Sequence, residues 1–159
     1  MSWQDHFTDL IRRAATDLPA DVEQALRRQA AAEIPGGRAA FALDTILENV
    51  ALARRKEVPM CQDTGTLTFW LDLPRGTDAL PLLEDIRRSV ANATERGWLR
   101  QNTIAEPEGR SLPDNLSAQH PVVHLRFAER DDVRVRLLLK GGGCENMSRQ
   151  YSLPETALN

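Results

Sequence analysis

Five consecutive residues of this chain, Cys61-Gln62-Asp63-Thr64-Gly65, combine a thiol, a carboxamide, a carboxylate, a hydroxyl and a glycine. A thiolate is a soft metal ligand, an amide both donates and accepts, and a carboxylate can give or take a proton. Two simpler interpretations stay open: Cys61 as a buried structural thiol, and Asp63 as the start of an Asx-type turn whose Gly65 supplies positive φ. The spacing alone does not separate them from a catalytic site.

A second stretch, Lys140-Gly141-Gly142-Gly143, follows an apolar run much later in the chain. Three glycines in a row let the backbone approach a ligand closely, and their N–H groups can bind an anion. The stretch is not a Walker A loop, because the lysine precedes the glycines. A flexible turn at the end of a strand is the alternative interpretation.

Arg100 follows a predicted helix and could bind a carboxylate through two parallel hydrogen bonds, although an arginine at such a position is more often a solvated surface group. His120 and His124 flank a predicted strand at a spacing that places them on one face, and we expect both to be structural. A mononuclear metal site made of Cys61, Asp63 and His124 is a weaker possibility.

These candidates need elements that bring them together. Apolar residues at helical spacing predict helices over 2–17, from 21 to about 34, and over 38–56. Val58-Pro59 ends the third helix, and period-two alternation then predicts a strand over 66–73. The first motif therefore lies on a helix-to-strand connection.

Further along, a helix is predicted from 77 or 78 to about 96, with Gly97 as its C-terminal stop. Residues 98–120 look irregular, and a loop of that length in a compact domain is usually functional. Alternation then predicts strands over 123–127 and 133–139, which we interpret as a hairpin ending at Lys140. The predicted fold class is α+β, an N-terminal helical layer packed on a small, mostly antiparallel sheet.

Length and composition narrow the classes of function. The 159 residues suit one domain, spanning 1–159, with 42% apolar and 5% aromatic residues. A net charge of −3 with interspersed signs argues against nucleic acid or a membrane as the partner. The two cysteines form no CxxC pair, the first residues lack signal-peptide features, and no apolar run is long enough for a membrane span. We expect a cytoplasmic protein.

With both motifs, and with Glu145-Asn146 after the glycines, the chain resembles the N-terminal half of the alpha region of class I, iron-sulfur fumarate hydratases and L(+)-tartrate dehydratase. The likeness spans nearly the whole chain, including Asn115-Leu116. The CQDTG string is a specific motif, whereas KGGG alone is weak.

The resemblance implies a lyase of the tricarboxylic acid cycle that reversibly hydrates fumarate to (S)-malate, or its relative that converts L-tartrate to oxaloacetate. It implies a 4Fe-4S cluster held by three cysteines, with one iron left open as a Lewis acid. By position, Cys61 matches the first cluster ligand. Gln62, Asp63, Arg100 and Gly143 match substrate-binding residues, and Asp63 lies near the chemistry.

The family pattern also predicts what is missing. The other two cluster cysteines would lie beyond Asn159, and Cys144 is not an evident substitute for them. We therefore expect a chain truncated at its C-terminus that is inactive without the downstream alpha and beta regions, in a homo- or hetero-oligomer. Fumarate hydratase is preferred because Lys140 and Glu145-Asn146 look more fumarase-like. The alternatives are a tartrate dehydratase alpha subunit and a non-catalytic remnant.

Overall fold

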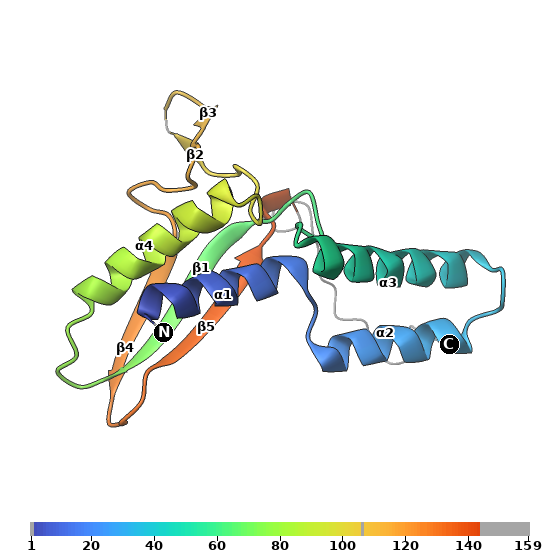
Figure 1. The fold of residues 1–159 in the computed structure, drawn as a ribbon, viewed down its shortest axis with the longest axis horizontal. Coiled ribbons are helices and arrows are strands. Elements are labelled where there is room, and N and C mark those ends of the chain that lie inside the picture. Colours follow the sequence, from blue (N-terminus) through green and yellow to red (C-terminus); the bar gives the residue numbers. More distant parts are fainter. Residues whose placement is uncertain (1, 106, 144–159) are drawn as a thin grey trace, which may run out of the picture.

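The computed structural model describes residues 2–105 and 107–143, and its centre is a three-stranded sheet (Figure 1). The strands are β1 (Thr66–Pro74), β4 (Val122–Ala128) and β5 (Arg134–Lys140), in the order β4-β1-β5. β1 pairs with β4 in parallel and with β5 in antiparallel orientation. The parallel pair needs a long crossover, which the helix after β1 and the segment that follows it provide.

One face of β1 forms the middle of the hydrophobic core. Because side chains alternate along a strand, the four leucine and phenylalanine residues of β1 point to one side, where all are buried. The helices α1 (Trp3–Thr16) and α4 (Leu80–Glu95) pack side by side over that face (Figure 1). The buried core residues are Phe7, Ile11, Ala15, Leu67, Phe69, Leu71, Leu73, Leu82, Ile86, Val90, Ala93, Trp98 and Leu99.

The N-terminal helix α1 is amphipathic and well capped. The Ser2 side chain accepts a hydrogen bond from the Asp5 N–H, and the Asp5 carboxylate accepts one from the Ser2 N–H. Such a capping box satisfies two N–H groups that a helix end leaves unpaired. Phe7, Ile11 and Ala15 recur every four residues on the buried face. The cap and the apolar stripe together explain why this segment is helical and packs on the sheet.

A second unit projects away from the sheet as an arm of two helices, α2 (Ala20–Ala32) and α3 (Arg38–Lys56) (Figure 1). The two helices contact each other, and α2 has no buried residue. At the base of the arm, the guanidinium of Arg54 on α3 pairs with the carboxylates of Asp17 and Glu23. The arm is therefore held to the body mainly at one end.

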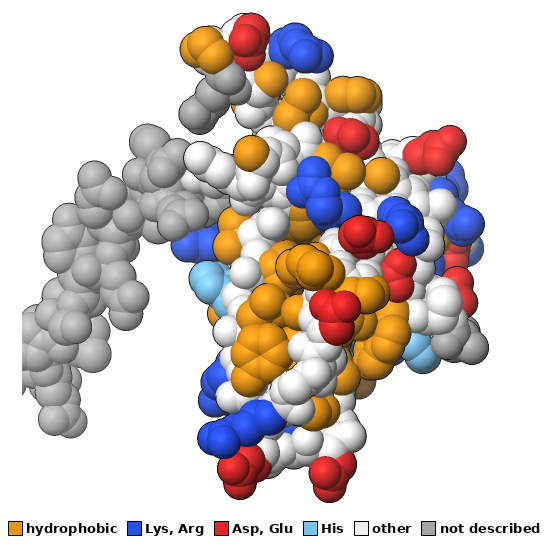
Figure 2. All heavy atoms as spheres, turned by 90° about the vertical axis from the view of Figure 1, so that its left-hand side faces the viewer, with side chains coloured by type: hydrophobic (Ala, Val, Ile, Leu, Met, Phe, Trp, Pro, Cys, Tyr) orange, Lys and Arg blue, Asp and Glu red, His pale blue; other side chains and the backbone are white. Residues whose placement is uncertain are grey.

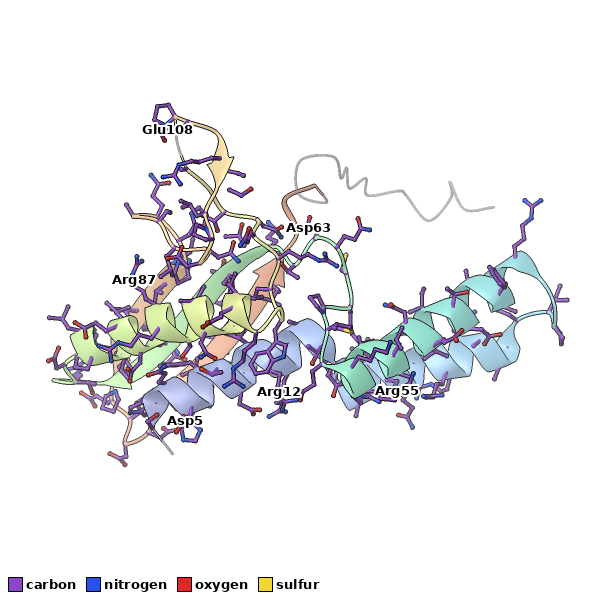
Figure 3. All side chains as sticks on the ribbon, turned by 45° about the horizontal axis from the view of Figure 1, so that its top comes forward. Asp5, Arg12, Arg55, Asp63, Arg87 and Glu108 are labelled. Carbon is purple, nitrogen blue, oxygen red and sulfur yellow. The ribbon has the colours of Figure 1, made fainter. Side chains whose placement is uncertain are left out.

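The segment after α4 carries a small two-stranded hairpin, β2 (Ile104–Ala105) with β3 (Arg110–Ser111). It protrudes beyond the end of the main sheet, with Glu108 at its tip (Figure 3). The predicted irregular loop over 98–120 thus contains this hairpin, and its other described residues lie in neither helix nor strand. No helix within the described parts of the chain is both long and apolar enough to span a membrane.

The structure confirms the α+β class with mostly antiparallel pairing: the main sheet has one parallel and one antiparallel pairing, and the separate small hairpin adds a second antiparallel one. The predicted hairpin of the last two strands is wrong, because β1 lies between β4 and β5. Alternation shows which face of a strand is buried but not which strand lies beside it. The helical layer also differs in detail: α1 and α4 cover the sheet, while α2 and α3 form the arm.

The sheet face opposite the helices is polar and rich in arginine. Asp72 on β1 is buried at its centre, with its carboxylate 2.7 Å from Arg126 and 3.4 Å from Arg136. The hydrogen bond from Arg126 holds the pKa of Asp72 below its ordinary value. Beside it, the rings of Trp70 and His124 stack with their centroids 5.4 Å apart. Interstrand pairs of charged and aromatic side chains therefore stabilise this face.

The helical layer does not cover the whole core face of the sheet. Figure 2 shows apolar side chains gathered on the side that faces left in Figure 1. Leu125 and Phe127 of β4 pair with Leu71 and Leu73 in the register, so they point to the helix side, yet 39% and 49% of their surface is exposed. The β4 edge of the sheet thus stays partly open.

Candidate functional site

The loop that carries the first motif joins α3 to β1 and is fastened at its start. The Met60 N–H donates to the Ala15 carbonyl of α1 (3.0 Å), and the Asn49 side chain of α3 donates to the Met60 carbonyl (2.9 Å). Figure 3 shows Asp63 at the end of the sheet, where this loop enters β1. Tertiary hydrogen bonds and a strand therefore position the loop from both sides.

The two carboxylate oxygens of Asp63 have different surroundings. Oδ1 accepts a hydrogen bond from the Gly65 N–H at 2.9 Å, and Gly65 has φ +74°. The Asx-type turn is thereby confirmed, with glycine supplying the positive φ. Oδ2 instead faces the glycine run, because a Cβ added to Gly141 would lie 2.8 Å from it and one at Gly143 3.9 Å from it. One oxygen is held in the turn while the other faces the second motif.

The two motifs meet through strand pairing. Thr66, just after the first motif, is the register partner of Lys140, which begins the second. A Cβ at Gly65 would overlap the backbone of Lys140, so the two segments touch without an intervening side chain. This close approach requires glycine at position 65 and accounts for the convergence of two distant sequence motifs.

A third segment, residues 100–103, packs against the first motif. The buried Thr64 hydroxyl accepts a hydrogen bond from the Arg100 N–H at 3.0 Å. With the Asn102 amide oriented by its hydrogen-bonding neighbours, its oxygen accepts from the N–H groups of Thr64 (3.2 Å) and Gly65 (3.1 Å). The backbone at Arg100 is thus fixed beside Asp63, while its side chain is exposed and has no ion-pair partner among the described residues.

These segments enclose an open pocket of about 350 Å³. Its lining residues are Asp63, Gly65, Thr66, Gln101, Asn102, Ile104, Gly142 and Gly143. Among the predicted site residues, the structure brings Asp63 and Gly143 into one pocket, whereas the side chains of Cys61, Gln62 and Arg100 lie outside its lining. A larger hollow of about 620 Å³ at the far end of the sheet is lined by turn residues, including the ion pair of Arg75 with Glu129.

Cys61 is exposed, so the interpretation as a buried structural thiol is wrong. The mononuclear metal site is also wrong, because no three His, Cys, Asp or Glu residues within 2–105 and 107–143 group to hold a metal ion. His124 is instead stacked on Trp70. Cys144 and Glu145-Asn146 lie outside the described residues.

Sequence reasoning gave no role to Asn102 or Asn115. Asn102 adjoins Arg100 and lines the pocket, and Asn115 is a buried residue with positive φ. For Asn115 two signs were available: Asn115-Leu116 belongs to the family likeness, and asparagine is one of the few residues that adopts a left-handed backbone conformation. The contacts of these two side chains could not be found from the sequence, because they join segments that come together only in the folded chain.

Comparison with known proteins relates nearly the whole chain to one family. The family model described as "Fumarate hydratase (Fumerase)" matches residues 4–158. A protein of Geobacillus stearothermophilus described as a class I fumarate hydratase is 43% identical over 145 residues, which are 91% of this chain and 28% of that protein.

Two further relatives are described as alpha subunits of L(+)-tartrate dehydratase. The protein of Methanocaldococcus jannaschii is 31% identical over 93% of this chain and 53% of its own length. The protein of Escherichia coli K12 is 28% identical over 87% of this chain and 45% of its own length. The chain therefore spans between about a quarter and about half the length of these relatives.

Proposed function

The chain belongs to the fumarate hydratase family, and we propose that it supplies one wall of the active site of a hydro-lyase that reversibly hydrates fumarate to (S)-malate. The observation that carries this proposal is the placement of Asp63. Its carboxylate is held by the Gly65 N–H on one side and faces the glycine run on the other, at a pocket of about 350 Å³. A pocket of that volume suits a small dicarboxylate.

The residues present fit an iron-sulfur cluster only as part of its ligand set. Cys61 offers one exposed thiol, and the described residues contain no group of three ligands. We propose that Cys61 is one of three cysteines that bind a 4Fe-4S cluster, with the others supplied by polypeptide beyond this chain. When bound, such a cluster supplies a Lewis acid for the substrate hydroxyl.

The chain's own residues would bind the substrate and move a proton. Arg100 would pair with one substrate carboxylate through its exposed guanidinium, and Gln62 and the Gly143 backbone would hydrogen-bond the substrate. Asp63 would transfer the proton at its Oδ2 atom, because Oδ1 is engaged in the turn. Fixing this carboxylate before substrate arrives lowers the entropy cost of the reaction.

We further propose that the chain is inactive alone and acts with a further alpha region and with a beta subunit or region. The support is the coverage of the relatives, since two of them are named alpha subunits and are about twice as long as the matched part. The exposed Leu125 and Phe127 offer apolar surface that additional polypeptide could cover.

The test uses this chain combined with the missing alpha and beta polypeptide of a relative, reconstituted anaerobically with iron and sulfide. Asp63→Asn keeps the acceptor for the Gly65 N–H but removes the carboxylate, so we expect kcat to fall by about 10²–10⁴. Asp78→Asn is the matched control, because the Asp78 Oδ1 accepts a hydrogen bond two residues ahead in the same way, from the Leu80 N–H. Equal activity in both variants would contradict the assignment of Asp63.

The cluster and the substrate are tested in the same assembly. We expect Cys61→Ser to lower the bound iron and the visible absorbance, whereas Cys144→Ser should leave both unchanged. Because relatives of both names match this chain, turnover is measured with fumarate and with L-tartrate. Turnover of L-tartrate alone would make the chain a tartrate dehydratase alpha subunit, and a cluster-free inactive assembly would support a non-catalytic remnant.

A further inference from the structure

Asn115 is a buried polar residue whose side chain is fully hydrogen-bonded. It is 3% exposed and has φ +58°, a backbone conformation that asparagine tolerates better than most residues. Its Oδ1 accepts from the N–H groups of Asn102 (2.9 Å) and Thr103 (3.0 Å). Its Nδ2 donates to the Arg100 carbonyl (2.7 Å) and to the Thr94 hydroxyl (3.1 Å). Three of the four partners therefore belong to one short segment, 100–103.

That segment has no helix or strand to hold it. Two backbone hydrogen bonds hold it, from Asn102 to Arg100 and from Leu112 to Thr103. Side chains add the rest: Asn115 binds its backbone from the side of α4, and Thr64 binds the Arg100 N–H from the side of the first motif. Asn102 then completes the connection by accepting hydrogen bonds from the Thr64 and Gly65 N–H groups. A chain of hydrogen bonds thus runs from α4, where the Thr94–Asn115 bond is buried, through residues 100–103 to the turn that holds Asp63.

We propose that Asn115 is a positioning residue for dicarboxylate binding. Asn115 is not itself part of the pocket lining. It acts by holding the backbone of residues 100–103, which carries the lining residue Asn102 and places Arg100 beside the first motif. The inference rests on the proposed function, in which Arg100 binds a substrate carboxylate. Without Asn115, residues 100–103 lose three hydrogen bonds, and the backbone from which the Arg100 side chain extends is no longer fixed. Substrate binding should therefore weaken more than proton transfer.

The physical part is tested on this chain alone by amide hydrogen exchange. Asn115→Gly keeps the positive φ but removes the carboxamide, so exchange at the Thr103 amide should rise at least about tenfold. The Asn102 amide should rise less, because its N–H also donates to the Arg100 carbonyl at 2.9 Å. Thr94→Val is the matched control, because it removes the hydroxyl that meets the Asn115 amide and the Asp114 carbonyl but leaves the three bonds from Asn115 to the segment. We expect it to leave those two amides protected. Unchanged exchange in Asn115→Gly would overturn the proposal.

The functional part uses the reconstituted assembly described above. We expect Asn115→Gly to raise KM for the dicarboxylate about tenfold while kcat falls less than about threefold, since the lost interaction concerns binding of one carboxylate. Thr94→Val should keep both constants. Equal shifts of KM in the two variants would show a merely structural role and overturn the proposal. An unmodified assembly without turnover would count against the proposed function, whereas the exchange result on the isolated chain would still stand.

Discussion

At the scale of single residues, Gly65 does two things that no other residue type can do at once. It adopts φ +74° in the turn where its N–H donates to the Asp63 carboxylate, and it lies directly against the backbone of Lys140. The first requirement disfavours most side chains, and the second leaves no room for a Cβ. The junction between the two motifs therefore depends on the absence of a side chain.

The change Gly65→Ala separates these two effects when it is compared with Gly97→Ala. Gly97 has the same φ of +74°, but nothing lies within 4 Å of a Cβ added there. We expect Gly97→Ala to lower the free energy of unfolding by about 1–2 kcal/mol. For Gly65→Ala we expect a loss of at least about 3 kcal/mol, because the backbone at Lys140 must also shift. Denaturant unfolding measures both, and equal losses would contradict the close approach.

Asp72 gives the stability a pH dependence with a defined sign. Its pKa in the folded chain lies below the ordinary value of 3.8, because Arg126 donates a hydrogen bond to the charged carboxylate. The ion pair's contribution is thus fully present above about pH 4 and is lost as the pH falls through the lowered pKa. We expect Asp72→Asn to reduce Tm at neutral pH, with a difference from the unchanged chain that disappears in acid.

The control for that experiment is Asp44→Asn, which removes one negative charge from the exposed surface of α3. It should leave Tm nearly unchanged at neutral pH. A Tm difference for Asp72→Asn that persisted unchanged at acidic pH would contradict the ion pair as its cause.

At the scale of elements, the sequence predicts those segments whose environment is set locally. Helix α3 spans Arg38–Lys56 as its apolar spacing predicts, and β5 ends at Lys140 as expected. The hairpin prediction failed because β4 and β5 each alternate correctly for either neighbour, and only the fold places β1 between them. Asp63 and Gly143 were recognised as candidates because their motifs are visible in the sequence. The contribution of residues 100–103 to the site was missed, because it depends on tertiary contacts that the sequence does not display.

The elements also differ in local stability, which amide hydrogen exchange measures. Helix α2 has no buried residue, whereas β1 is paired on both sides and buried on one face. We therefore expect the α2 amides to exchange fastest among the helices and the β1 amides slowest in the chain. Arg54→Gln removes the ion pairs to Asp17 and Glu23 and should raise exchange in α2 without changing β1. Equal exchange rates for α2 and β1 would show that the arm is not a separate, weaker unit.

At the scale of the whole molecule, the sheet and the arm are two structurally distinct parts. The sheet with α1 and α4 forms the core and ends at the pocket, while the arm extends from the motif-bearing loop away from it (Figure 1). The pocket is shaped by three segments that are distant in sequence, so it exists only when the complete sheet has formed. Two features of that sheet remain open to further polypeptide, the β4 edge with Leu125 and Phe127 and the pocket itself.

The order β4-β1-β5 has a consequence for synthesis of the chain. Of the three strands in this sheet, β1 is synthesised first. Both of its partners are made later, and β5 is the last element before the glycine run. Until β5 has been made, at least one backbone edge of β1 is unpaired, and such edges promote aggregation. We expect a chain ending at Asp132 to be insoluble or bound to chaperones, whereas one ending at Gly143 should fold. Comparing the soluble fractions of the two truncations during translation measures this, and equal solubility would contradict the dependence of β1 on its last partner.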